Sequence, residues 1–309
     1  MTLDQIIGQA VPVSILKRAL STNSLGHAYL FSGEEGVGKE TTARVVAEEL
    51  AKQGGPLSSL HVLGGEGSIK IEDIRQLRQS ASLASAGNTV WLILDADRLT
   101  PEAGNALLKT LEEPVPGTHF FLTTTKVQSM LPTIVSRCQH LQFRRIPEEE
   151  ICQWLAKQTQ QSPADERIRT ISRLAQGSLG KALAYWKGSL LEERETVISK
   201  LIQVPRASYP AVLGLSQTWP EDREKIHQEL QVFLEWHRDL LTVKNGIDLP
   251  LYNPGYERQL KEISALYTND TLFVIIEKIV EMGKAIAGNG RIRFCLGYLL
   301  LMMKRGALT

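Results

Sequence analysis

The residues best suited to chemistry form a glycine-rich segment that runs from Gly33 to Lys39 with the sequence GEEGVGK. It supplies the first seven positions of a Walker A phosphate-binding loop. In such a loop, glycines let backbone N–H groups converge on phosphate oxygens, the following helix adds its positive N-terminal dipole, and the lysine adds a point charge. An ordinary glycine turn can have the same composition, but a position between a strand and a helix favours the phosphate loop. The candidate nucleotide-binding residues are Gly33, Gly36, Val37, Gly38, Lys39, Glu40 and Thr41.

The eighth position of this loop departs from the motif. A Ser or Thr hydroxyl is needed there to bind Mg²⁺, but the residue is Glu40, and Thr41 follows one place late. Two like charges 4 Å apart repel by about 4 kcal/mol at an effective dielectric of 20, so a carboxylate beside a triphosphate is unfavourable. Carboxylate oxygen is also an ordinary magnesium ligand, so Glu40 could replace the hydroxyl if its longer side chain changed the geometry.

A second motif, the Walker B strand, is also incomplete. The apolar run Thr89–Leu94 is followed by Asp95-Ala96-Asp97. If Asp97 takes the last polar place of the motif, Leu94 replaces the metal-binding Asp and Asp95 replaces the water-positioning Glu. If the register shifts by one residue, Asp95 can ligate the metal, but Ala96 then stands in the water-positioning place. Either register lacks one catalytic carboxylate, so we predict that the chain does not hydrolyse ATP.

These residues require a parallel sheet to position them. Short apolar runs alternate with helix-like segments, which predicts parallel strands covered by helices on both faces. The predicted strands are 28–32, 60–63, 89–94, 119–123 and 141–143. The predicted helices of this part are one beginning after Gly38, with Ala43, Val46, Ala47 and Leu50 on one face, and two more over 71–83 and 101–113.

Strand signals end after Pro147, and the rest of the chain is predicted to be helical. Short helices are expected over 148–187 and longer ones beyond, including a helix capped by Asn269 or Asp270. We therefore predict three domains. They are an α/β P-loop domain at 1–145, a small helical lid domain at 146–188, and an all-α domain at 189–309.

Composition excludes several classes of protein. Lys and Arg number 35 against 34 Asp and Glu, and a formal net charge of +1 disfavours autonomous charge-driven binding to DNA or acidic membranes. The 3 cysteines lie far apart and form no Cys-x-x-Cys pair, so we predict neither a disulfide framework nor a zinc or other metal site. The N-terminus has no secretory signal pattern, and no apolar run reaches the roughly 20 residues of a membrane span. We expect a cytoplasmic protein.

Several longer stretches resemble one family. The segments 6–9, 26–33, 105–114, 131–138 and, more weakly, 177–183 are similar to the delta-prime subunits of the bacterial DNA polymerase III clamp loader, members of the AAA+ superfamily. The resemblance implies an α/β AAA+ P-loop domain, a small helical lid and a C-terminal all-α oligomerisation domain, or collar. The resemblance is strongest over the first 143 residues. In the last domain it concerns only the expected helical architecture and no sequence motif.

The same resemblance gives a role to Arg137. Ser136-Arg137-Cys138 is similar to the motif whose arginine reaches the ATP site of a neighbouring subunit. A guanidinium is always charged, and its fork matches phosphate oxygens, so it can neutralise charge on a γ-phosphate. A surface or ion-paired arginine at a helix end is the alternative. The eight-residue match over 131–138 favours the arginine finger.

Departures from the family pattern agree with a subunit that does not hydrolyse ATP. The sensor 1 position near Thr125 carries Lys126 where Asn is common, and the sensor 2 arginine falls at Gly180, beside Lys181. Only residues 51–59 occupy the place where many relatives insert a cysteine-rich zinc module, so no zinc is expected.

The resemblance therefore implies a non-hydrolysing component of the DNA polymerase III holoenzyme, a DNA-directed DNA polymerase. Its partners would be gamma/tau-type ATPase subunits and a delta-type subunit in a hetero-pentamer, which loads a sliding clamp onto primed DNA. No cofactor is required, although ATP or ADP could bind without hydrolysis. Two alternatives stay open: an active AAA+ motor subunit that uses Glu40 as a metal ligand, and a subunit that binds ATP only as a structural ligand.

Overall fold

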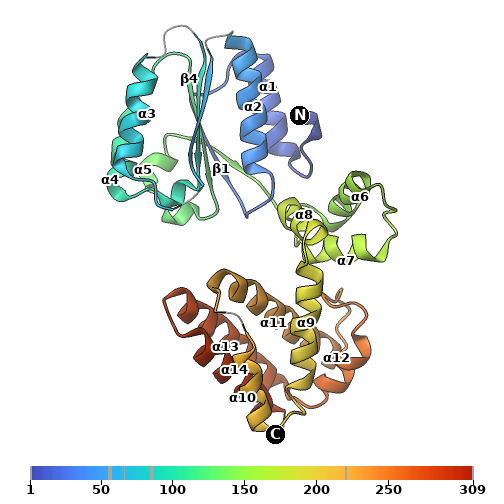
Figure 1. Ribbon diagram of the computed structural model, residues 1–309. Coiled ribbons are helices and arrows are strands. Elements are labelled where there is room, and N and C mark those ends of the chain that lie inside the picture. The colour runs from blue at the N-terminus through green and yellow to red at the C-terminus, as the bar shows by residue number, and fades with distance from the viewer. Residues whose placement is uncertain (1, 55–57, 66, 84–86, 220, 308–309) are drawn as a thin grey trace. The chain divides into compact units, whose positions relative to one another are not determined.

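The chain folds into two compact units, Met1–Trp186 and Lys187–Thr309. The computed structural model describes residues 2–54, 58–65, 67–83, 87–219 and 221–307 (Figure 1). The division into three domains stays a prediction, because the first unit contains both the α/β region and the short helices that follow it.

The first unit is built on a five-stranded sheet in which each neighbouring pair of strands is parallel. The order across the sheet is β2-β3-β4-β1-β5. The strands are β1 Ala28–Ser32, β2 Ser59–Gly64, β3 Thr89–Leu94, β4 Thr118–Thr124 and β5 Gln139–Gln142. The predicted parallel sheet is thus confirmed, and its strands match within two residues.

The largest difference concerns β5, which begins at Gln139 rather than at the predicted 141 and ends one residue before Phe143. Gln139 and His140 are exposed on this edge strand and Leu141 is buried, so the apolar pattern marks only the middle of the strand. Its pairing with β1 sets Gln139 beside Tyr29 and Gln142 beside Ser32.

Helices cover both faces of the sheet (Figure 1). One face packs against α1 Ala10–Ser21 and α2 Lys39–Gly54, and the other against α3 Ile71–Leu83, α4 Pro101–Glu112 and the short α5 Pro132–Val135. Side chains of β1 alternate between the two layers, since Tyr29 and Phe31 join the first core and Ala28 and Leu30 the second. Burial on both faces explains why the central strands are continuously apolar.

The helix α4 has well-defined ends. Thr100 caps it by accepting a hydrogen bond from the Ala103 backbone N–H at 3.2 Å, and Pro101 occupies the first helical position. The helix ends at Glu112, shortly before Pro114, because a proline has no backbone N–H to continue the helical hydrogen bonds. Three further helices complete the first unit: α6 Glu148–Thr159, α7 Glu166–Leu174 and α8 Leu179–Lys187.

The second unit consists of helices around one apolar core. They are α9 Leu190–Gln203, α10 Tyr209–Gln217, α11 Arg223–Lys244, α12 Glu257–Ser264, α13 Asn269–Ala287 and α14 Ile292–Gly306. The predicted cap of α13 is wrong by one or two residues. Thr268 is the cap, with its side-chain oxygen accepting from the Thr271 N–H at 3.1 Å; three adjacent cap-forming residue types made the choice ambiguous in sequence.

A buried polar network fastens the long α11 to its neighbours. Arg194 of α9 pairs with Glu235 at 2.5 Å and donates to Asn253 at 2.8 Å. Asp239, fully buried, accepts from the backbone and side chain of Asn253, both at 2.8 Å. Buried charges are tolerated only when they are paired and hydrogen-bonded in this way. The network therefore fixes the segment before α12 onto α11.

In the part of the chain that the structure describes, each helix is too short or too polar to cross a membrane.

We expect buried His237 to make the second unit less stable in acid. Burial lowers the pKa of its imidazole from 6.5 to about 4, although the hydrogen bond to the Phe233 carbonyl opposes this shift. Because the unfolded chain binds a proton first, stability is present above about pH 6.5 and is lost as the pH falls towards 4. At about 1.4 kcal/mol per pKa unit, the loss is about 3 kcal/mol. Urea-dependent amide exchange of α11 at pH 7.0 and 4.5 measures it.

The control is His237→Gln, whose amide can still donate to Phe233 but does not titrate. A loss of stability in acid that is equal in the variant and the natural chain would show that His237 is not its source.

Candidate functional site

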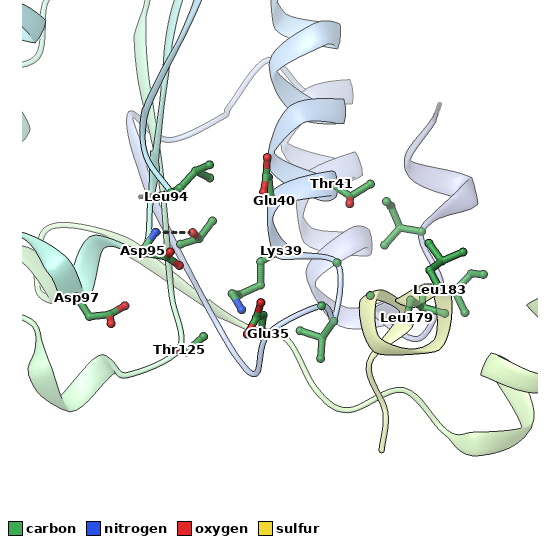
Figure 2. Close-up of a pocket in the computed structure, with 18 of the residues that line it drawn as sticks. Glu35, Lys39, Glu40, Thr41, Leu94, Asp95, Asp97, Thr125, Leu179 and Leu183 are labelled. Atoms are coloured by element: carbon green, nitrogen blue, oxygen red, sulfur yellow. Dashed lines mark hydrogen bonds between the residues drawn. The ribbon is translucent and has the colours of Figure 1, made fainter. Parts of the chain in front are cut away.

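A cavity of about 670 Å³ lies at the carboxyl ends of the parallel strands. Its walls come from the loop after β1, the ends of β3 and β4, the N-terminal segment Gln5–Ile7, and helices α6 and α8 (Figure 2). The structure brings together nearly all of the predicted site residues, and those that line the cavity are Gly36, Val37, Gly38, Lys39, Glu40, Thr41, Leu94, Asp95 and Asp97. Gly33 lies outside this set and donates its backbone N–H to Thr124 at 3.2 Å.

The Lys39 ammonium is held by its own loop. It is buried and donates to the carbonyl oxygens of Gly33 at 2.8 Å and Glu34 at 2.6 Å. Burial lowers the pKa of this lysine, while the negative charge of Asp95 opposes the shift most strongly among the nearby carboxylates. A buried ammonium in a glycine-rich loop at a helix start is the arrangement that receives a phosphate anion.

Glu40 is paired with a cation on its own helix. Its carboxylate accepts from Arg44 Nε at 2.8 Å and lies 2.7 Å from Arg44 Nη2, one turn along α2. Figure 2 shows this carboxylate on the side of the helix start away from the Lys39 ammonium. To bind a metal at the phosphates, the Glu40 carboxylate would have to leave Arg44.

The end of β3 supplies only part of a Walker B site. Leu94 lines the cavity with an apolar side chain. Asp95 has a left-handed backbone, with φ of 50°, and its N–H donates to Thr123 Oγ1 at 3.1 Å. Asp97 accepts from Thr124 Oγ1 at 2.6 Å. Among the nearby carboxylates, Asp95 raises the pKa of Lys39 most strongly. Leu94 offers no metal ligand.

The two positions suggested as sensors also line the cavity. Thr125 and Lys126 follow β4, and Gly180 lies in the first turn of α8. Lys126 and Gly180 therefore occupy the cavity positions at which the sequence resemblance leads us to expect an asparagine and an arginine. Among the described residues, no group of three His, Cys, Asp or Glu side chains is arranged to hold a metal ion.

Contacts that the sequence did not predict hold the phosphate loop in place. Gln9 donates to the carbonyls of Val37 at 3.2 Å and Arg144 at 2.7 Å, and Arg145 pairs with Glu34 at 2.6 Å. The Gly180 N–H donates to the Gly36 carbonyl at 3.2 Å. Gln9 lies in segment 6–9, which resembles the family, and this could have marked it as a candidate. Nothing in the sequence around Arg145 indicates its pairing with Glu34.

Trp154 is a further cavity residue that sequence reasoning missed. It comes from α6, and its position in an amphipathic helix resembles that of any core aromatic. With Leu179 and Leu183 of α8 it gives one wall of the cavity an apolar character suited to a flat ring.

Arg137 does not belong to the described lining of this cavity. It follows α5, donates from Nη1 to the Thr133 carbonyl at 3.0 Å and forms an ion pair with Glu112. Its side chain remains 34% exposed. The neighbouring Cys138 is buried, and burial raises the pKa of its thiol to about 12, which agrees with a packing role rather than a nucleophilic one.

Comparison with known proteins shows which family this chain is similar to. A family model described as "DNA polymerase III, delta subunit" matches residues 52–147. The chain is 27% identical over 318 residues to the DNA polymerase III subunit delta' of Bacillus subtilis, covering 95% of each chain. It is 32% identical over 271 residues to the DNA polymerase III subunit gamma of Buchnera aphidicola, covering 77% of this chain and 74% of that relative.

This chain belongs to the family of DNA polymerase III clamp-loader subunits. The resemblance to the delta-prime members is confirmed by the match along 95% of both chains. By contrast, the chain spans only 30% of the length of the tau/gamma subunit of Haemophilus influenzae.

The fold of this clamp-loader subunit agrees with that of a solved structure. A DNA polymerase III gamma subunit-related protein from Thermotoga maritima has a TM-score of 0.50 and 17% identity, covering 94% of this chain and 99% of the other. At this identity the likeness concerns the fold alone. The predicted fold class, a parallel α/β sheet followed by helices, is confirmed.

We expect Gly36→Ala to loosen the contact between the phosphate loop and α8. Gly36 has a φ of +74°, and a Cβ atom there would lie 2.2 Å from Ser178 Oγ. Strain from the positive φ alone costs roughly 1–2 kcal/mol for a residue with a Cβ atom. The overlap with Ser178 adds to it, so amide exchange at Gly180 should become faster.

Gly38→Ala is the matched control, because its φ is +100° but nothing lies within 4 Å of the added Cβ. Equal effects of the two variants on Gly180 exchange would show that backbone strain, and not the α8 contact, is responsible.

Proposed function

We propose that this clamp-loader subunit is of the non-hydrolysing delta-prime type and that Arg137 acts on the ATP of a neighbouring ATPase subunit. One observation carries the proposal. The chain retains a phosphate-binding loop, but Glu40 is paired with Arg44, and Leu94 ends the strand that should provide a metal ligand. The protein would bind phosphate groups without the ligands that position magnesium and attacking water.

The place of Arg137 supports action on another subunit. The cavity lies at the carboxyl ends of the strands, whereas Arg137 precedes the amino end of β5. Four residues of strand, about 13 Å at 3.3 Å each, separate that end from the edge of the sheet where the cavity lies. A partly exposed guanidinium there is better placed for a second molecule than for its own cavity, and its fork suits a γ-phosphate.

We propose the partners from the family. Gamma/tau-type ATPase subunits and a delta-type subunit would complete a hetero-pentamer, with the helices of Lys187–Thr309 forming the collar. Through this assembly the subunit would take part in loading a sliding clamp onto primed DNA, in the cytoplasm and as a component of DNA polymerase III. A net charge of +1 suits a subunit that leaves most DNA contacts to its partners.

A structural nucleotide is the second candidate. The cavity volume of about 670 Å³ falls within the range of 300–1,000 Å³ that is usual for small-molecule sites. The Lys39 ammonium, the loop N–H groups and the apolar wall at Trp154 could hold ATP or ADP without hydrolysing it. The third possibility, an active motor, requires Glu40 to exchange Arg44 for a metal ion.

The isolated chain should release phosphate from ATP only at background rate, because Leu94 and the paired Glu40 provide neither a metal ligand nor a base. The measurement is steady-state phosphate release with Mg²⁺, with a gamma-type subunit as the positive control. Turnover of about 1 s⁻¹ or more, abolished by Lys39→Ala, would instead identify an active motor.

Arg137→Ala should slow ATP hydrolysis by the reconstituted complex by roughly 10³-fold if the residue acts as a full arginine finger. Arg137→Lys should be intermediate, since it retains the charge but loses the bidentate fork. Arg18→Ala, which alters an exposed arginine of α1, serves as the control. A complex that assembles with Arg137→Ala and hydrolyses ATP normally would refute this role.

A further inference from the structure

Arg137 is held on two sides. Its Nη2 pairs with the carboxylate of Glu112, the last residue of α4, and its Nη1 donates at 3.0 Å to the Thr133 carbonyl of α5. These contacts engage two of the five N–H donors of a guanidinium. The side chain is thus fixed in direction although a third of it is exposed.

The segment that precedes Arg137 also packs against α4. At Gly104 the two elements approach so closely that a Cβ atom would lie 2.7 Å from Leu131 Cδ1 and 3.6 Å from Ile134 Cδ1. The turn then continues from Ile134, whose carbonyl accepts the Arg137 N–H at 3.1 Å. The helix α4 therefore positions the backbone before Arg137 through the close contact at Gly104, and it positions the guanidinium through Glu112.

We propose that Glu112 is a positioning residue for Arg137, an inference that rests on the proposed arginine-finger role. A long arginine side chain has many rotamers, and an unsupported finger would have to be ordered each time it met a γ-phosphate. Pre-organisation by a fixed carboxylate removes part of that cost, and small displacements of a catalytic group lower rates strongly. Glu112 would act through Arg137, without touching the nucleotide.

A merely structural ion pair makes a different prediction. Glu112 and Arg137 are 47% and 34% exposed, and pairs at such exposure contribute little to stability. A structural role would thus leave both folding and hydrolysis unchanged when Glu112 is replaced. A positioning role leaves folding unchanged but lowers the rate of hydrolysis.

The test uses the complex reconstituted with its ATPase and delta-type subunits, with clamp and primed DNA present. Glu112→Ala should lower kcat for ATP hydrolysis about 10-fold with KM unchanged, because orientation in the transition state is lost while substrate binding is retained. Glu112→Gln, whose amide oxygen still accepts a hydrogen bond, should recover part of the rate. Glu113→Ala, at the adjacent exposed glutamate, should match the natural complex.

The double variant Glu112→Ala with Arg137→Ala decides how the carboxylate acts. If Glu112 works only through Arg137, the double variant hydrolyses ATP at the rate of Arg137→Ala alone. A lower rate, or a Glu112→Ala complex at or above the natural rate while Arg137→Ala is impaired, would overturn the inference. An Arg137→Ala complex with normal hydrolysis would instead refute the proposed function itself.

Discussion

Parallel pairing of β1 with β4 on one side and β5 on the other is the constraint from which the site follows. Because parallel strands end at the same edge, the loop after Ser32, the residues after Thr124 and the segment after Gln142 must meet there. The Phe143 N–H extends this pairing by donating to the Ser32 carbonyl at 2.7 Å. The same pairing leaves the chain before β5, which carries Arg137, at the other end of that strand.

Charges around the cavity are largely satisfied by the protein itself. Glu40 is paired with Arg44, Glu34 with Arg145, and Lys39 with two backbone carbonyls of its own loop. A site that must bind magnesium needs carboxylates directed at the metal, whereas Glu40 and Glu34 are each paired with an arginine. The pairing of these glutamates therefore supports our proposal that this subunit does not itself hydrolyse ATP.

The two candidate roles of the chain use different ends of α4. Its N-terminal end follows the 3₁₀ turn Ala96–Arg98 at the cavity, and its C-terminal residue Glu112 pairs with Arg137. A helix of 12 residues spans about 18 Å. A single helix thus lies between the cavity at the strand ends and the arginine that we propose as the finger.

The sequence by itself determined the parallel sheet, the helical second half and the place of the glycine-rich loop between a strand and a helix, because continuous apolar runs and the glycine spacing are local signals. It also indicated that Leu94 offers no metal ligand, since residue type alone decides this, but it left open whether the Glu40 carboxylate could bind Mg²⁺. Only the tertiary structure decided that Glu40 turns to Arg44, that Gln9 and Trp154 reach the cavity, and that Glu112 holds Arg137. These contacts join residues whose pairing depends on rotamers and chain packing, and no short-range pattern in the sequence records them.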